Sequence, residues 1–294
     1  MAPKLAPDTT PDAALRQIVT HCHEDLMKYR AVVLANRRPI GIHQTRVALR
    51  RLRAAFSVFR DAAQGGTTGE IGRRELQALS AEAKWIAGEC APARDLHVFL
   101  TETVGDVPPV VARVARRLAA SHLERARTAL SGARFAMFEA ALSAYAAQEP
   151  SSKGSRLDTF GRAVLDKRAG QVARRAHKLA SLDGERLHRL RIAIKKLRYA
   201  ATFLMPAFAG RPFDSRAARA YIEATVRLQG ALGTLNDRAV AGQMMADIAV
   251  AARPTEDVAR PLAKLAKQAS SGEKHRHRRL QRAWKAFRKV GRFW

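Results

Sequence analysis

The sequence predicts an all-α protein, and three observations support this fold class. Ala, Leu and Arg, all of which favour helices, dominate the chain. Aromatic residues make up only 6% of the sequence, and no alternation of β-branched and polar residues is long enough to predict a strand. Gly and Pro gather in short stretches that separate long helical segments, as expected for turns between helices.

These breaks divide the chain into twelve expected helices. Thr10 followed by Pro11 is a typical helix entrance. In the first half we expect helices over about 11–34, 41–63, 69–90, 94–104, 109–131 and 134–147. In the second half we expect them over about 157–180, 184–208, 213–233, 236–251, 255–270 and 273–290.

An internal repeat indicates that the two halves arose by duplication. The segment HQTRVALRRLR at 43–53 aligns with HRLRIAIKKLR at 188–198, at an offset of 145 residues. A second match, PARDLHV at 92–98 with TLNDRAV at 234–240, follows in the same order at an offset of 142. Related halves usually pack about a pseudo-two-fold axis, which we expect here.

The domain organisation follows from this repeat and from composition. Residues 1–11 are polar and rich in Pro, so we expect a short disordered lead-in. One domain should occupy 12–290. Its halves would be about 12–147 and 157–290, joined by a linker at 148–156 that holds three Ser, one Gly and one Pro.

The charge of the chain points to an anionic partner. It holds 53 Lys and Arg against 26 Asp and Glu, which gives a formal net charge of +27. Forty of the cations are Arg, whose planar guanidinium binds two phosphate oxygens at once. Such an excess of one sign is usually retained for nucleic acid, an acidic membrane or another polyanion.

The two repeated helices give part of this charge a location. On a helical wheel, His43, Arg46, Arg50 and Arg53 form one stripe along the edge of an apolar face. His188, Arg191, Lys195 and Arg198 do the same in the second copy. No Asp or Glu occurs from 39 to 60 or from 186 to 209. Stripes beside an apolar face point into a groove between helices, so the two would form a positive cleft if they converge.

These motifs, with RDLHV and LQGALGTLND downstream, resemble those of the CHAD family, the histidine α-helical domains. The resemblance covers about residues 12–290 and implies two pseudo-symmetric four-helix bundles. It also implies binding of inorganic polyphosphate in a basic central cavity, and association with polyphosphate granules in the cytoplasm. By motif match, it implies these binding residues: His43, Arg46, Arg50, Arg51, Arg53, His188, Arg191, Lys195, Lys196 and Arg198. One departure is that Tyr199 follows the second motif, whereas Ala54 takes that place in the first.

Residues that flank the repeated motifs complete the expected site. Lys84, Arg94 and Arg238 are further candidates for the cleft. Asp95 and Asp237 recur in both copies, and we interpret them as carboxylates that orient a cleft Arg rather than as metal ligands or catalytic acids.

Two alternatives to polyphosphate binding remain open from the sequence. A protein that binds the backbone of nucleic acids would use the same cations, but the first stripe has no interleaved aromatic residues for base stacking. A phosphate-transferring or hydrolysing enzyme is the second alternative. No P-loop, nucleophile–base pair or ExExK motif of the tunnel-type triphosphate hydrolases occurs, so we expect no catalysis.

The remaining features predict packing rather than chemistry. We expect no metal and no cofactor, because His21, His23 and Glu24 lack the spacing of a helical metal site. Cys22 and Cys90 should lie in the core. The basic segment after Lys274 includes Trp284 and Phe287, and could be either a membrane-surface helix or, as we favour, the last helix of a bundle. No apolar run is long enough to predict a transmembrane helix.

Overall fold

The computed structural model describes residues 5–35, 40–60, 69–103, 107–151, 154–208, 215–270 and 273–294. Within these ranges, the side chains of 69–71, 102–103, 234–239, 269–270 and 273–274 are not described. Across the described residues the chain is helical and contains no strand, which confirms the predicted all-α class. None of the described helices is both long enough and apolar enough to cross a membrane.

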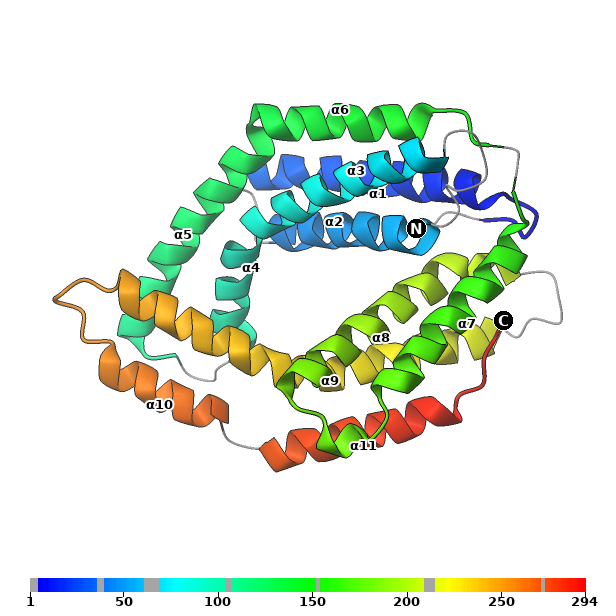
Figure 1. Ribbon diagram of the computed structural model, residues 1–294. Helices are drawn as coiled ribbons and strands as arrows, with labels where there is room; N and C mark the ends of the chain where they lie inside the picture. The colour runs from blue at the N-terminus through cyan, green and yellow to red at the C-terminus, as the bar shows by residue number, and fades with distance from the viewer. Residues whose placement is uncertain are drawn as a thin grey trace.

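Four helices of the first half form a closed group at the top of Figure 1. Helix α1 contacts α2 and α6, and α3 contacts the same two helices. The side chain of Thr10 caps the start of α1, with Pro11 in the first turn as predicted. The bounds of the group are α1 Pro11–Leu34, α2 Ile40–Phe59, α3 Gly69–Glu89 and α6 Ala133–Ala147.

Four helices of the second half form the lower group. Helix α8 packs between α7 and α9, and α11 packs along α9. The bounds are α7 Leu157–Arg175, α8 Gly184–Leu204, α9 Ser215–Ala251 and α11 Glu273–Lys289, with short 3₁₀ turns at Leu179–Ser181 and Met205–Phe208. Asp183 caps α8 by accepting the backbone N–H of Arg186.

One end of the molecule has a separate hydrophobic core (Figure 1, left). There α4 (Ala91–Val98) continues into a short π-helix (Phe99–Thr103). These elements pack with α5 (Pro109–Ser131), α10 (Ala259–Ser270) and the last part of α9. This second core is built from residues such as Phe99, Val111 and Ile248, each at most 1% exposed.

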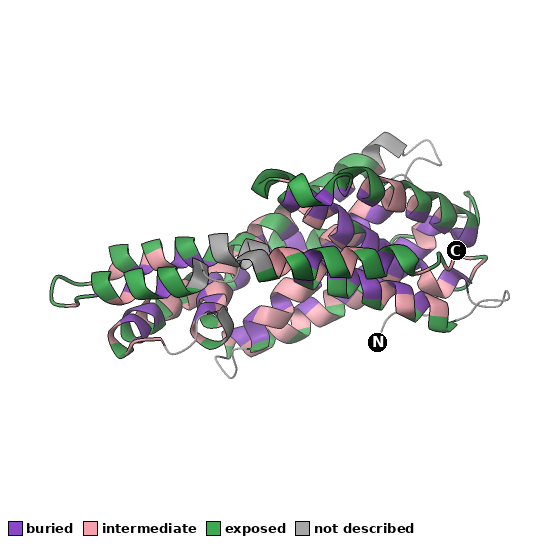
Figure 2. Cartoon of the chain, turned by 90° about the horizontal axis from the view of Figure 1, so that it is seen from below, coloured by how far each residue is buried: buried purple, intermediate pink, exposed green. Residues whose placement is uncertain are grey.

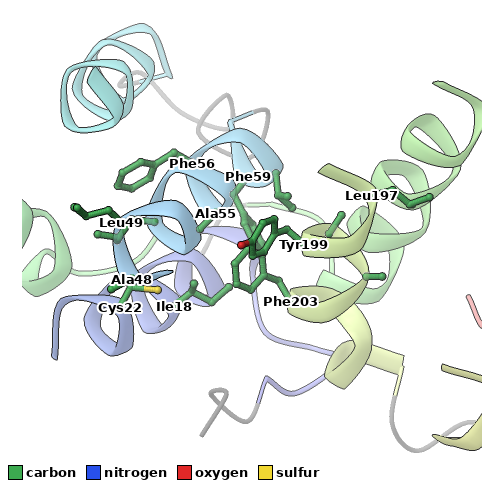
Figure 3. Packing of buried hydrophobic residues seen from close by; sticks show 14 of the residues in the cluster. Ile18, Cys22, Ala48, Leu49, Ala55, Phe56, Phe59, Leu197, Tyr199 and Phe203 are labelled. Atoms are coloured by element: carbon green, nitrogen blue, oxygen red, sulfur yellow. The ribbon is translucent and has the colours of Figure 1, made fainter. Parts of the chain in front are cut away.

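The main hydrophobic core joins the upper and lower groups, and this fixes α2 beside α8. Figure 3 shows Tyr199 and Phe203 of α8 directed toward Ala55 and Phe59 of α2. Phe59 also stacks on Phe160 of α7, with ring centroids 5.5 Å apart. Because the residues in this contact are buried and close-packed, the two helices are held in one relative position.

Two expectations from the sequence require correction. Helix α9 runs unbroken from Ser215 to Ala251, whereas two helices were predicted. Gly233 near the expected break weakens a helix without ending it, and no Pro lies nearby. The lead-in was expected to be disordered, but its residues 5–10 are ordered: Leu5 is 4% exposed, and the carbonyls of Pro7 and Thr9 accept backbone hydrogen bonds from the start of α7. The duplication and the pseudo-two-fold axis stay predictions.

Candidate anion-binding site

The cationic stripes of α2 and α8 converge. Their core faces are placed as the wheel predicted, since Leu49, Leu52, Ile194 and Leu197 are all buried. The stripes lie at the edges of these faces, where α2 and α8 meet. Lys195 on α8 is close enough to Arg50 and Arg53 on α2 for their charges to affect its ionisation.

Two adjoining cavities lie where the stripes of α2 and α8 meet. The inner cavity, of about 420 Å³, lies between α2, α3 and α8 and is lined by Arg50, Arg53, Ala54, Ser57, Val58, Ser80, Ile192, Lys195, Lys196 and Tyr199. The outer cavity, of about 690 Å³, lies between α2 and α3 and is lined by Arg53, Phe56, Ser57, Arg60, Arg73, Leu76, Gln77, Ser80, Ala81 and Lys84. The two share Arg53, Ser57 and Ser80. We call the pair the cationic groove.

The groove has an electrostatic character that favours an anion. No Asp or Glu lines either cavity among the residues that the structure describes. Burial, together with the positive charges of Arg50, Arg191, Arg53 and Arg198, lowers the pKa of Lys195 from its ordinary 10.5 to about 8. Burial alone also lowers the pKa of Arg53. The cations therefore repel one another, and a bound anion would relieve this repulsion.

Two guanidinium groups at the meeting of the stripes have hydrogen-bond donors without a protein partner. Nε of Arg53 and Nε of Arg191 are buried, and neither donates to a described residue. Buried donors are nearly always satisfied in folded proteins, because an unpaired one costs about 1–3 kcal/mol. Arg53 lines both cavities, so its Nε is a candidate for binding an acceptor that enters the groove. Arg191 lines neither cavity, but its charge contributes to lowering the pKa of Lys195.

Tyr199 positions the cations around it. Its hydroxyl accepts a hydrogen bond of 2.7 Å from Nε of Arg50, which crosses from α2 to α8. The guanidinium of Arg198 lies over the Tyr199 ring, 4.6 Å from its centroid, and donates to Oε1 of Gln229 at 2.8 Å. Tyr199, the residue at which the second motif departs from the first, thus contacts one cation from each of the two helices.

The first half of the α2 stripe makes contacts with protein instead. Arg46 donates to the carbonyl of Ala87 on α3 at 3.0 Å, and Arg94 donates to Nδ1 of His43 at 3.3 Å. Burial raises the pKa of Asp95, while the charges of Arg46 and Arg94 oppose this shift. Burial lowers the pKa of Arg46, and the charge of Asp95 opposes that shift. Asp95 therefore lies close enough to Arg46 and Arg94 for their charges to interact, and its role in orienting a cleft Arg stays a prediction.

Some predicted residues lie elsewhere. Arg51 faces α1 and pairs with Asp25 at 3.3 Å, on a different side of α2 from the groove. His188 is exposed near the start of α8 and lines neither cavity. Lys84, in contrast, lines the outer cavity. Asp237 and Arg238 lie outside the described side chains.

The structure adds cations that motif matching did not identify. Arg60 and Arg73 line the outer cavity. Arg168 and Arg175 of α7 lower the pKa of Lys196, after burial as the largest cause, and Arg168 also donates to the Ser57 carbonyl at 2.9 Å. These residues lie outside the repeated motif, and only the packing of α7 against α2 and α8 brings Arg168 to this place. Of these cations, Arg73 and Arg175 belong to basic pairs in the sequence, at 73–74 and 174–175, which do not by themselves indicate a binding site.

The cluster around Cys22 is used for packing. Cys22 is fully buried, and burial raises the pKa of its thiol to about 12. His21 lies near Glu24 and Asp25, whereas His23 contacts Glu139 on α6. Within the described part of the chain, no three His, Cys, Asp or Glu side chains gather in a way that could hold a metal ion.

The basic C-terminal helix is the last helix of the lower group, as we favoured. Phe287 of α11 is buried and packs on Tyr221 of α9, with ring centroids 5.4 Å apart. Trp284 stacks on Phe287. The apolar side of α11 therefore faces the protein and is not available for insertion into a membrane.

Comparison with known proteins assigns the family. The CHAD domain model matches residues 17–246, and the chain belongs to the CHAD domain family. The crystal structure of the CHAD domain from the plant Ricinus communis is similar, with a TM-score of 0.81 and 24% identity over 99% of this chain and 96% of that one. PptA from Streptomyces chartreusis has a TM-score of 0.54 and 16% identity over 96% and 98% of the two chains. At these identities the likeness concerns the fold. No curated protein sequence matches.

Proposed function

We propose that this protein binds inorganic polyphosphate in the cationic groove, without catalysing a reaction on it. The strongest support is the meeting of Arg50, Arg53 and Lys195 from two helices in a groove lined by no acid among the described residues. Membership of the CHAD family, whose resemblance implied this ligand, supports the same proposal.

The chemistry of the groove suits a linear chain of phosphates. From Arg50 to its last residue, Phe59, α2 rises by about 13 Å, and Arg60 follows directly, so the cations along this stretch can contact successive phosphates. The Arg side chains would bind oxygens in pairs, whereas Lys195 and Lys196 act as compact charges. Binding neutralises the polyanion and releases its counterions, so affinity should fall steeply with salt.

The groove offers few contacts to nucleobases. Tyr199 is an aromatic residue of the inner cavity, but it is 6% exposed, and both its ring and its hydroxyl are covered by Arg198 and Arg50. Base stacking, which supplies much of the affinity for single strands, is therefore unsupported here. Association with cytoplasmic polyphosphate granules is the cellular role that follows from the proposed ligand.

A charge-reversal experiment tests the site. The variant Arg50→Glu/Lys195→Glu should bind long polyphosphate at least about 100-fold more weakly, since each charge-assisted contact contributes about 1.5–3 kcal/mol. The matched control is Arg186→Glu/Arg189→Glu, which makes the same charge change on exposed positions of α8 that line neither cavity. Equal affinity of the two variants, with helix content preserved, would refute the site.

Two further assays test the ligand and the absence of catalysis. Competition of polyphosphate with duplex DNA, at equal phosphate concentration and near-physiological salt, should favour polyphosphate. A clear preference for DNA would replace the proposal with nucleic-acid binding. Incubation with polyphosphate or nucleoside triphosphate and Mg²⁺ should release no phosphate. Turnover that Asp95→Asn abolishes would identify an enzyme.

A further inference from the structure

A second cationic groove lies on the outside of the lower group. A cavity of about 320 Å³ between α9 and α11 is lined by Ala224, Arg227, Ala231, Arg279, Arg282, Ala283, Ala286 and Phe287. It shares no lining residue with the cationic groove. Figure 1 places α11 at the lower edge of the molecule, on the far side of α8 and α9 from α2. We call this cavity the α9–α11 groove.

The walls and floor of this groove are suited to a narrow anionic chain. Arg279 and Arg282 line it from α11 and Arg227 lines it from α9, and all three are exposed. Four Ala residues also line the groove, and their short side chains leave room for a ligand between the Arg side chains. Arg227 pairs only loosely with Glu223, at 3.5 Å with both side chains more than 60% exposed. Such surface pairs contribute little, so a phosphate can displace the carboxylate.

The surrounding surface of α11 extends this positive charge. In the view from below, the outer sides of the lower helices are largely exposed (Figure 2). Four more cations are exposed on α11: Arg278, Lys285, Arg288 and Lys289. No acid occurs in the chain from 274 to 294. A polyanion at the groove would therefore meet further positive charge along α11.

Other occupants fit less well. Leu280 and Phe287 are buried against the protein, and Trp284 stacks on Phe287, so α11 has no apolar side to insert between lipids. Phe287 lines the groove but is only 9% exposed, so it offers little surface for stacking a nucleobase. A phosphate chain needs only charge and a narrow path, and both are present.

We propose that the α9–α11 groove is a second binding site for a segment of polyphosphate, weaker than the cationic groove. This inference rests on the proposed function and adds to it, because one molecule would then hold two segments. On a long chain the second contact becomes intramolecular and raises the overall affinity, whereas two short chains bind independently.

The test counts sites with a short polyphosphate and measures affinity with a long one. Wild type should bind two short chains, and Arg279→Glu/Arg282→Glu should lose the weaker of these while keeping the tighter. For the long chain, this variant should lose about tenfold in affinity, and its salt slope should fall by about 1.4, since two fewer cations are neutralised. The matched control is Arg260→Glu/Lys264→Glu, which makes an equal charge change at exposed positions of α10 that line neither groove.

The outcomes separate this inference from the proposed function. If Arg279→Glu/Arg282→Glu behaves like its control with polyphosphate, the second site is refuted while the cationic groove stands. If Arg50→Glu/Lys195→Glu keeps the tighter site, the proposed function fails at its groove. Parallel titrations use phosphatidylserine vesicles and duplex DNA. A loss confined to either of them in Arg279→Glu/Arg282→Glu would assign the α9–α11 groove to that partner and overturn the inference.

Discussion

Helices α2 and α8 hold matching motifs, but the protein uses the first part of each motif differently. On α2, His43 and Arg46 make hydrogen bonds to Arg94 and to the Ala87 carbonyl, beside the half-buried Asp95. At the matching positions on α8, His188 is exposed and Nε of Arg191 has no partner among the described residues. A shared motif therefore indicates where cations lie, whereas their neighbours decide whether they stabilise the fold or remain available to a ligand.

The largest expected difference comes from the same substitution at matching positions. Arg46→Ala should lower the free energy of unfolding by about 1–3 kcal/mol, because it removes the hydrogen bond to Ala87 and a partner of Asp95. Arg191→Ala should leave stability unchanged or raise it, and should weaken polyphosphate binding about tenfold. Chemical denaturation and binding titrations of both variants check this. A reversal of the two effects would remove the distinction between the helices.

The next prediction concerns pH and Lys195. With a pKa of about 8 in the free protein, Lys195 loses its charge above pH 8, so affinity should be full below pH 8 and decline as pH rises above it. The decline cannot exceed about tenfold per pH unit. Lys195→Gln should bind more weakly and lose most of this pH dependence. An equal decline in wild type and variant would exclude Lys195 as its source.

The same group makes stability change in the opposite direction. The folded-state pKa lies below the ordinary 10.5, so folding disfavours the charged form. The free energy of unfolding without ligand should therefore gain a contribution from Lys195 as pH rises from about 8 toward 10.5. Denaturant titrations at pH 7.5 and 9.5, with Lys195→Gln as the control, measure this contribution. The result contradicts the assignment if the variant shows the same gain.

A smaller effect is expected where the second motif departs from the first. Tyr199→Phe removes the hydroxyl that accepts from Arg50 and keeps the ring beneath Arg198. Polyphosphate affinity should fall about three- to tenfold, since Arg50 loses its positioning but not its charge. Calorimetric titration at pH 7 checks this. An unchanged affinity would mean that Arg50 needs no positioning by Tyr199.

The smallest effect is predicted for Arg51. It belongs to the motif, but it pairs with Asp25 of α1 outside the groove. Arg51→Ala should therefore change polyphosphate affinity less than twofold and stability by about 0.5 kcal/mol. A large loss of binding would show that the groove extends to a side of α2 that the structure assigns to packing.

The fold was largely predictable because helical periodicity and Pro or Gly breaks are local signals. Helix α1 was predicted with its observed bounds, Pro11–Leu34, because Thr10 and Pro11 define its start. The continuous α9 was missed because a helix can tolerate Gly233 when its faces are packed by neighbouring helices. The order of residues 5–10 depends on hydrogen bonds to α7, which no local pattern reveals.

The candidate site was predictable only where helix geometry determines the direction in which a side chain points. The stripe of Arg50, Arg53 and Lys195 could be placed beside the core from its spacing alone. Arg168 reaches Ser57 through the packing of α7 against α2, 111 residues away in sequence, so no local pattern could identify it. Arg51 was assigned to the site by motif match, whereas its partner Asp25 belongs to another helix.

Chemical labelling of Lys195 with and without polyphosphate tests the central claim most directly. At pH 8 an amine-reactive reagent should modify Lys195, whose pKa is about 8. Polyphosphate should protect Lys195 in proportion to the fraction of protein molecules whose cationic groove is occupied. The exposed Lys178 and Lys264, which line neither groove, should be modified equally in both samples, as read by peptide mass spectrometry. Modification of Lys195 that saturating polyphosphate does not reduce would contradict binding in the cationic groove.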